Sequence, residues 1–209
     1  MTSTPTWNTR APLCVDNVLP AALCLELLRH FDSSVQRPRS YQGIVNESLR
    51  KCAYAAVPQL LADRVTDTVT PHLDGYFGVE TRAVPGQPAL IYRYGPGVGF
   101  VTHHDEVTAE ETDRAAANGQ PIIGGDLTTL LFLSGPDEYG GGDLYFVEPP
   151  LELRPARGAL IAFPATRQYL HGVRPITSGE RYTLLIRRAV CRTRLPQRTG
   201  PSHILQQSK

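Results

Sequence analysis

Short apolar runs separated by glycine and proline fill the second half of the chain and restrict the folds open to it. Each run has five to eight residues, which suits a strand better than a helix of ordinary length. Several short strands with frequent turn residues predict a β-sandwich or a β-barrel. The six runs span residues 89–94, 99–104, 127–134, 143–147, 158–163 and 182–189.

The first half shows helical periodicity instead. Two segments carry apolar residues at three- and four-residue spacing, which indicates amphipathic helices. The first stripe is Leu23, Cys24, Leu27, Leu28 and Phe31, and the second is Leu60, Leu61, Val65, Val69 and Leu73. We therefore predict one domain over residues 1–209, of mainly β class with flanking N-terminal helices (α+β). A helical support region, 13–87, precedes a β core, 88–191, and the polar ends, 1–12 and 193–209, are predicted to be flexible.

Charge and cysteine content give no indication of a nucleic-acid partner, an anionic membrane partner or a cysteine-based site. The 21 basic and 20 acidic residues leave a formal net charge of +1, so the balance does not predict binding to nucleic acid or to an anionic membrane. The four cysteines form no C-x-x-C pair and are predicted to be free thiols. Neither a signal peptide nor an apolar run of the ~20 residues that cross a bilayer is found. We therefore expect a cytoplasmic protein.

The first chemical signal is the sequence His103-His104-Asp105 at the end of a predicted strand. Side chains alternate faces along a strand, so His103 and Asp105 are expected to point the same way and His104 the other way. An imidazole and a carboxylate that converge suit a divalent metal such as Fe(II). An H-x-D pair by itself is more typical of a solvated loop, so further ligands decide the interpretation.

A third ligand and a basic residue follow in the same order along the chain. His171 lies 66 residues beyond Asp105, after the apolar run 158–163, and Arg181 comes ten residues later, after a turn. We expect His171 and Arg181 on neighbouring antiparallel strands. Two histidines and a carboxylate are the ligands of non-haem iron oxygenases, and a guanidinium can bind a carboxylate through two parallel hydrogen bonds.

In this order the motifs resemble those of the iron(II)/2-oxoglutarate dioxygenases, prolyl 4-hydroxylase-like branch. Residues 92–100, YRYGPGVGF, resemble that branch's approach to H-x-D, and residues 127–134 resemble its hydrophobic strand. Residues 139–146, YGGGDLYF, resemble its Gly-Gly-x-Leu turn, and residues 171–181 resemble its H-x-V-x-P ending followed by the basic residue. The resemblance covers about half of the chain. It is specific for cofactor chemistry and weakly informative about substrate.

The resemblance implies a double-stranded β-helix, a jelly-roll or cupin-like barrel of two sheets with the site in one mouth. It implies that His103, Asp105 and His171 are the catalytic residues and bind Fe(2+), with O2 as a substrate and ascorbate as a possible reductant. Because related halogenases lack the carboxylate that Asp105 provides, its presence favours hydroxylation, or another hydrogen-abstraction outcome such as desaturation, over halogenation.

The resemblance also implies a site for 2-oxoglutarate as co-substrate. Arg181 is the expected partner of the carboxylate far from the metal. Tyr94 matches the position of a tyrosine whose hydroxyl contacts the same carboxylate. Thr183, two residues from Arg181 on the same strand face, is expected to add a hydroxyl.

The expected reaction is hydroxylation of an unactivated C–H bond with release of succinate and CO2. We expect a small-molecule substrate, such as an amino acid or a natural-product intermediate, because no second domain for a protein substrate is evident. Peptidyl prolyl hydroxylation is the alternative. The segment 106–125 is a candidate lid. Five residues could line the mouth, although structural roles are more ordinary for each: Arg93, Asp126, Tyr145, Arg174 and Arg187.

Two other classes of protein fit part of the pattern. A non-catalytic binding module on the same fold would be expected to lose a metal ligand, yet all three are present. A cupin-like metal hydrolase or isomerase could use the three ligands for zinc, but this interpretation leaves Arg181 and Tyr94 without a role. Oxygen consumption in the presence of 2-oxoglutarate distinguishes these classes. The sequence does not determine the oligomeric state.

Overall fold

The structure, a computed structural model of the chain, describes residues 6–34, 37–38, 52–117 and 124–191. The helices are η1 (Thr6–Thr9), α1 (Ala21–Ser33), α2 (Gln59–Phe77) and α3 (Ala109–Ala117). The first strands are β1 (Leu13–Val15), β2 (Arg37–Pro38), β3 (Ala53–Ala56), β4 (Glu80–Ala83), β5 (Leu90–Tyr94), β6 (Phe100–His103) and β7 (Leu127–Phe132). The others are β8 (Tyr139–Gly141), β9 (Leu144–Phe146), β10 (Leu151–Leu153), β11 (Leu160–Pro164), β12 (His171–Val173), β13 (Ile176–Gly179) and β14 (Arg181–Cys191).

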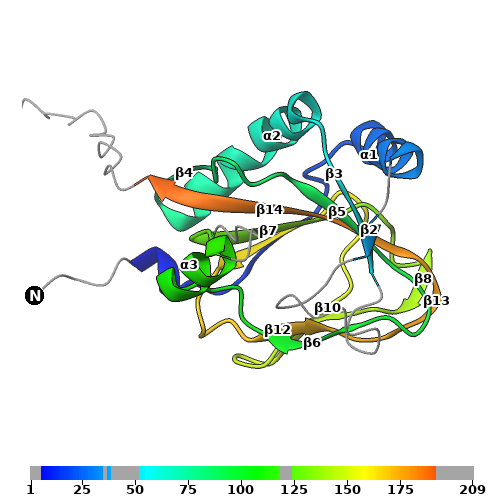
Figure 1. Cartoon of the computed structure of the whole chain (residues 1–209). Coiled ribbons are helices and arrows are strands. Elements are labelled where there is room, and N and C mark those ends of the chain that lie inside the picture. The colour runs from blue at the N-terminus through cyan, green and yellow to red at the C-terminus, as the bar shows by residue number, and fades with distance from the viewer. Residues whose placement is uncertain (1–5, 35–36, 39–51, 118–123, 192–209) are drawn as a thin grey trace, which may run out of the picture.

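The strands form two facing sheets (Figure 1). The larger sheet has the order β1-β11-β7-β14-β5-β3-β2, with β4 also paired to β14, and the smaller has the order β10-β9-β12-β6. A short ribbon, β13-β8, accompanies them. From β5 onward the chain passes back and forth between the sheets, because β5, β7, β11 and β14 belong to the larger and β6, β9 and β12 to the smaller. This alternation is that of a double-stranded β-helix and confirms the predicted fold class.

Helices α1 and α2 cover the outer face of the larger sheet (Figure 1). Their apolar stripes pack against the outward-facing residues of β7, β11 and β14, which forms the first of two cores. The members of this outer core include Leu27, Phe31, Val65, Val69, Leu73, Leu127, Leu131, Leu160, Leu184 and Ile186. Among the described residues, no helix combines the length and the hydropathy that crossing a bilayer requires.

The second core lies between the two sheets. Tyr92, Phe132, Phe163 and Leu185 of the larger sheet meet Phe100, Leu144, Phe146 and Val173 of the smaller sheet. Residue parity on β14 separates the two cores, because Leu184 and Ile186 belong to the outer core and Leu185 to the inner one. The odd-numbered residues of β14 therefore face the interior of the barrel, where the predicted site residues lie.

Some sequence predictions need correction. Leu60 was placed on the apolar stripe of the second helix, but its side chain is 78% exposed, because the buried stripe of α2 runs through Leu61, Val65, Val69 and Leu73. The segment 1–12 is predicted to be flexible and this stays a prediction, although Thr6–Thr9 form a 3-10 helix and Tyr169 donates a hydrogen bond of 2.6 Å to the carbonyl of Arg10. Residues 1–5 and 192–209 lie outside the described residues.

The packing of α2 gives a quantitative prediction. We expect Leu73→Ala to lower the free energy of unfolding by about 2–5 kcal/mol, because Leu73 is fully buried in the outer core and its truncation leaves a cavity. Leu60→Ala is the matched control on the same helix, with an expected change within about 0.5 kcal/mol. Urea denaturation followed by circular dichroism measures both. Equal losses for the two variants would contradict the helix orientation.

Candidate metal and co-substrate site

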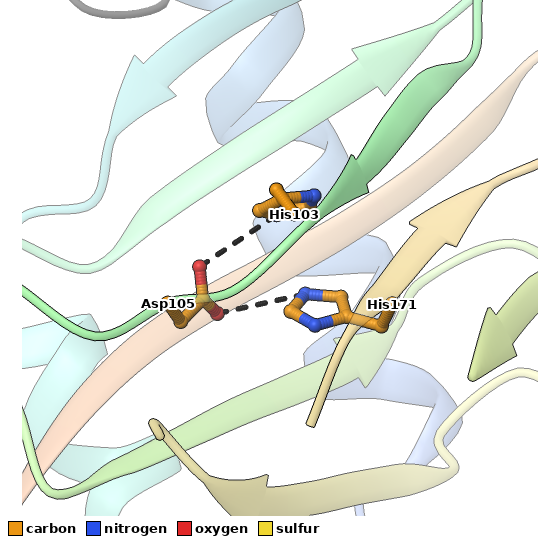
Figure 2. Close-up of side chains that lie close together, drawn as sticks. All are labelled: His103, Asp105 and His171. Carbon is orange, nitrogen blue, oxygen red and sulfur yellow. Dashed lines mark ion pairs between the residues drawn. The ribbon is translucent and has the colours of Figure 1, made fainter. Parts of the chain in front are cut away.

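The three predicted metal ligands meet between the two sheets. The ligand atoms of His103, Asp105 and His171 all lie within 4.8 Å of one another. Nε2 of His103 is 3.7 Å from Oδ1 of Asp105, and Nε2 of His171 is 3.7 Å from Oδ2. Figure 2 shows the carboxylate facing both rings. The arrangement offers two imidazole nitrogens and one carboxylate to a single divalent ion.

Strand pairing in the smaller sheet brings the two histidines together. His103 on β6 and His171 on β12 are direct cross-strand partners, with ring centroids 4.3 Å apart. A bulge lies just before His103, since one residue of β12, Gly172, opposes two of β6, Val101 and Thr102. Phe100 and His103 therefore both face inward, with ring centroids 3.8 Å apart, and Asp105 follows two residues after the strand ends. The bulge thus turns the side chain of His103, at the end of β6, toward His171.

Hydrogen bonds to the backbone orient both imidazoles. Nδ1 of His103 lies 2.9 Å from the carbonyl oxygen of Val101, and Nδ1 of His171 lies 2.8 Å from that of Tyr169. Because a carbonyl only accepts, each Nδ1 carries a proton, and in the neutral imidazole Nε2 then has a lone pair that can bind a metal. This is the tautomer that binds a metal through Nε2.

Two residues of the larger sheet hold the carboxylate of Asp105. Nη2 of Arg187 donates to Oδ1 at 2.7 Å, and the hydroxyl of Thr128 donates to Oδ2 at 2.7 Å. Burial alone would raise the pKa of Asp105, but Arg187 and the two histidines hold it well below its usual range. Burial lowers the pKa of His171, although Asp105 opposes this shift. A carboxylate and an uncharged imidazole are the protonation states that bind a metal.

Arg181 lies in the interior, separated from the ligands. Its side chain is 1% exposed, and its guanidinium carbon lies 4.8 Å from the ring centre of Phe132 and 5.4 Å from that of Tyr94. Burial lowers its pKa, and the hydroxyls of Tyr94 and Tyr139 oppose that shift. In the described part of the chain, its Nε has no hydrogen-bond partner and no carboxylate forms an ion pair with it. A buried cation of this kind is expected to bind an anion.

The other two predicted co-substrate residues lie beside Arg181. Tyr94 on β5 is its direct cross-strand partner, and Thr183 is two residues further along β14 on the same face. Both side chains are buried, at 5% and 3% exposed. Tyr139 at the start of β8 also lines this region, and burial raises the pKa of its hydroxyl while Arg181 lowers it. The sequence interpretation treated Tyr139 only as part of a turn, since no local pattern links it to Arg181.

One prediction about strand pairing was wrong. His171 and Arg181 do not lie on neighbouring strands, because β12 pairs with β6 and β9 in the smaller sheet, and β14 pairs with β4, β5 and β7 in the larger. The ten-residue spacing does not form a simple hairpin, because β13 intervenes and pairs with β8. The two residues therefore approach the interior from opposite sheets.

The candidate lid is helical in part. Within residues 106–125 the structure has α3, which begins with reciprocal hydrogen bonds between Thr108 and Glu111, a capping box. Glu106 just before it accepts a hydrogen bond of 2.9 Å from the backbone N–H of Arg167. This contact joins the segment after one ligand, Asp105, to the segment before another, His171. Residues 118–123 lie outside the described part.

Comparison with known proteins places this site in a family. The model of the 2OG-Fe(II) oxygenase superfamily matches residues 89–186, which include all three predicted metal ligands and Arg181. A PKHD-type hydroxylase of Gluconacetobacter diazotrophicus is 36% identical over 96 residues, which are 45% of this chain and 39% of that protein. A PKHD-type hydroxylase of Burkholderia ambifaria is 37% identical over 147 residues, 68% of this chain and 61% of that protein.

Residues 89–186 of the chain are similar to the 2OG-Fe(II) oxygenase superfamily. The chain spans between 39% and 61% of the length of these two relatives. Solved structures of the superfamily share the fold. A viral collagen prolyl hydroxylase of Paramecium Bursaria Chlorella virus-1 superposes with a TM-score of 0.64 at 20% identity, covering 87% of this chain and 98% of that one. A Pseudomonas putida prolyl-4-hydroxylase superposes with a TM-score of 0.58 at 18% identity, covering 86% and 94%.

The residues present fit the groups that 2OG-Fe(II) oxygenases use, namely Fe(II), 2-oxoglutarate and O2. The two imidazoles and one carboxylate are a donor set suited to Fe(II) with coordination positions left open. The buried guanidinium of Arg181, with an unpartnered Nε, suits the carboxylate of a dicarboxylic acid. The fit therefore rests on two separate features, which a zinc hydrolase would not need together.

Proposed function

We propose that this protein is an Fe(II)- and 2-oxoglutarate-dependent hydroxylase with His103, Asp105 and His171 as metal ligands. The convergence of these three side chains, of which His171 is buried and the other two are partly buried, is the observation that supports the proposal most strongly. When bound, the iron, with 2-oxoglutarate and O2, supplies the oxidising power that hydroxylates a C–H bond while succinate and CO2 are released.

The side chains of the chain have distinct roles in this proposal. His103 and His171 present Nε2 to the ion, because their Nδ1 protons are engaged by backbone carbonyls. Arg181 binds the far carboxylate of 2-oxoglutarate, with Tyr94 and Thr183 beside it, and this fixes the orientation of the co-substrate. The aromatic rings of Phe146 and Phe163 pack against His171, at 5.8 and 4.6 Å between centroids, and exclude water from behind it.

Anaerobic titration tests the assignment of both cofactor sites in one experiment. We expect a weak visible charge-transfer band when Fe(II) and 2-oxoglutarate are both present, and no such band with either alone. The band requires metal and 2-oxo acid to share one site. Zn(II) in place of Fe(II) is the control, because its filled d shell gives no such band. Absence of the band with both components present would contradict the proposal.

Two classes of substrate fit the proposed reaction. A small molecule, such as an amino acid or a natural-product intermediate, remains the substrate that we propose first. A prolyl residue in a peptide is the second candidate, supported by the names of the relatives, which are PKHD-type hydroxylases, and of the structural neighbours, which are prolyl hydroxylases. Succinate release with free L-proline, other amino acids and proline-containing peptides separates the two classes, since only the true class stimulates turnover above the uncoupled background.

A further inference from the structure

The metal ligand Asp105 is held by a pair of side chains that the proposed ligand set does not include. Arg187 donates to one carboxylate oxygen and Thr128 to the other, both at 2.7 Å. Nη1 of Arg187 also donates to the hydroxyl oxygen of Thr128. Arg187 therefore contacts Asp105 directly and supports the second donor at the same time.

The position of this pair follows from the register of the larger sheet. Arg187 on β14 and Thr128 on β7 are direct cross-strand partners, so both side chains leave the sheet at the same place and on the same face. Arg187 shares its inward face with Arg181 and Thr183. One strand thus supplies the candidate co-substrate residues near its start and a partner of the metal ligand six residues after Arg181.

The neighbouring arginine shows that this placement is specific to one face. Arg188 is also buried, but it points to the helical side, where its Nη2 donates to the hydroxyl of Thr70 at 2.7 Å and to the carbonyl of Thr81 at 3.0 Å. Its contacts join the sheet to α2 and β4. Arg187 instead contacts a ligand of the proposed metal centre, with side chains 11% and 10% exposed.

We propose that Arg187, together with Thr128, is a positioning residue that fixes the carboxylate of Asp105 for metal binding. The inference rests on the proposed function, which assigns Asp105 as a ligand. An ionised carboxylate has about four lone-pair sites on two oxygens. One donor on each oxygen stops rotation of the group and leaves lone pairs for the ion, beside the two imidazoles at 3.7 Å. Without this clamp, formed by Arg187 and Thr128, the bound ion alone would have to order the carboxylate.

Removal of Arg187 has two opposed effects on metal affinity. It removes a positive charge near the ion, which favours binding, and it frees the ligand carboxylate, which disfavours binding. Partners of metal ligands typically contribute about 10- to 100-fold to affinity or activity, so we expect the loss of orientation to dominate. Arg187→Met should therefore raise the Kd for Co(II), used as a spectroscopic probe, by about 10-fold or more.

The experiment compares Co(II) affinity and the visible Co(II) spectrum of the full chain, without 2-oxoglutarate, in four variants. Arg187→Met removes the clamp, and Arg187→Lys keeps the charge without the planar fork that spans two acceptors. Thr128→Val removes the donor to Oδ2 and is nearly isosteric, so it tests the idea even if Arg187→Met fails to fold. Arg64→Met is the matched control, because Arg64 pairs with Glu26 at the same 2.7 Å but on the exposed helical layer.

The inference predicts weaker Co(II) binding and an altered spectrum for Arg187→Met and Thr128→Val, only partial recovery for Arg187→Lys, and no change for Arg64→Met. Wild-type affinity and spectrum in both clamp variants would overturn it, and full recovery by lysine would show that charge without geometry suffices. If the unaltered protein binds neither Co(II) nor Fe(II), the proposed function itself fails. If it binds them and the clamp variants match it, only the role of Arg187 fails.

Discussion

Alanine at His103 or His171 is expected to abolish succinate formation from 2-oxoglutarate. Each substitution removes one of three ligand atoms that lie within 4.8 Å of one another. Loss of an outer-shell partner alone costs up to about 100-fold in metal affinity, so we expect loss of a ligand to exceed that figure. Succinate release and the iron retained after anaerobic gel filtration measure the two effects.

A control is needed because His171 is also part of the buried core. His72→Ala changes an exposed histidine on α2 and should leave turnover and iron content unaltered. Circular dichroism establishes whether His103→Ala and His171→Ala remain folded. A folded variant that produces succinate at the rate of the unaltered protein would show that the altered histidine is not a ligand.

Replacement of Arg181 by methionine is expected to weaken 2-oxoglutarate binding by roughly 30- to 150-fold. The estimate takes about 2–3 kcal/mol for hydrogen bonds to a charged group, with 1.4 kcal/mol for each factor of ten. Co(II) binding in the absence of 2-oxoglutarate should be unchanged, because the clamp on Asp105 is made by Arg187 and Thr128 and not by Arg181. Isothermal titration with 2-oxoglutarate measures the first effect.

The same variant makes a less obvious prediction about stability. Arg181 is a buried cation without a carboxylate ion pair among the described residues, so until an anion binds its desolvation is offset only in part, by Tyr94, Tyr139 and the ring of Phe132. Arg181→Met should therefore not lower the Tm of the protein without ligand. Arg82→Met, at an exposed position of β4, is the control for both measurements. A large fall in Tm, or unchanged 2-oxoglutarate affinity, would assign Arg181 a structural role.

The sequence predicted the catalytic half of the fold well. Each of the six apolar runs overlaps one strand of the structure, namely β5, β6, β7, β9, β11 and β14. The strands that were missed have two to four residues, such as β8, β10 and β13, and a segment that short has too few residues to show a period. Leu60 was misplaced because two adjacent leucines both fit a helical stripe, and only packing against the sheet decides which one is buried.

Spacing along the chain and proximity in space also differ at the site. The bulge before His103 places Phe100 and His103 on the same face of β6, whereas a regular strand would place them on opposite faces. A bulge leaves no clear signal in the residue pattern. The ten residues between His171 and Arg181 suggested a hairpin, whereas the chain crosses from one sheet to the other. Tyr139 was overlooked because its contact with the Arg181 region depends on that crossing.

By itself the sequence identified the residues that we propose carry the chemistry, because the ligand set and the basic residue are a property of residue type and order. It also determined the β-rich core, because side-chain periodicity is local. Only the tertiary structure decided that Arg187 contacts a metal ligand while Arg188 contacts the helical layer. The reason is physical, because adjacent residues of a strand face opposite sides of the sheet. Which side faces the site depends on how the two sheets pack against each other, and the sequence alone does not show this.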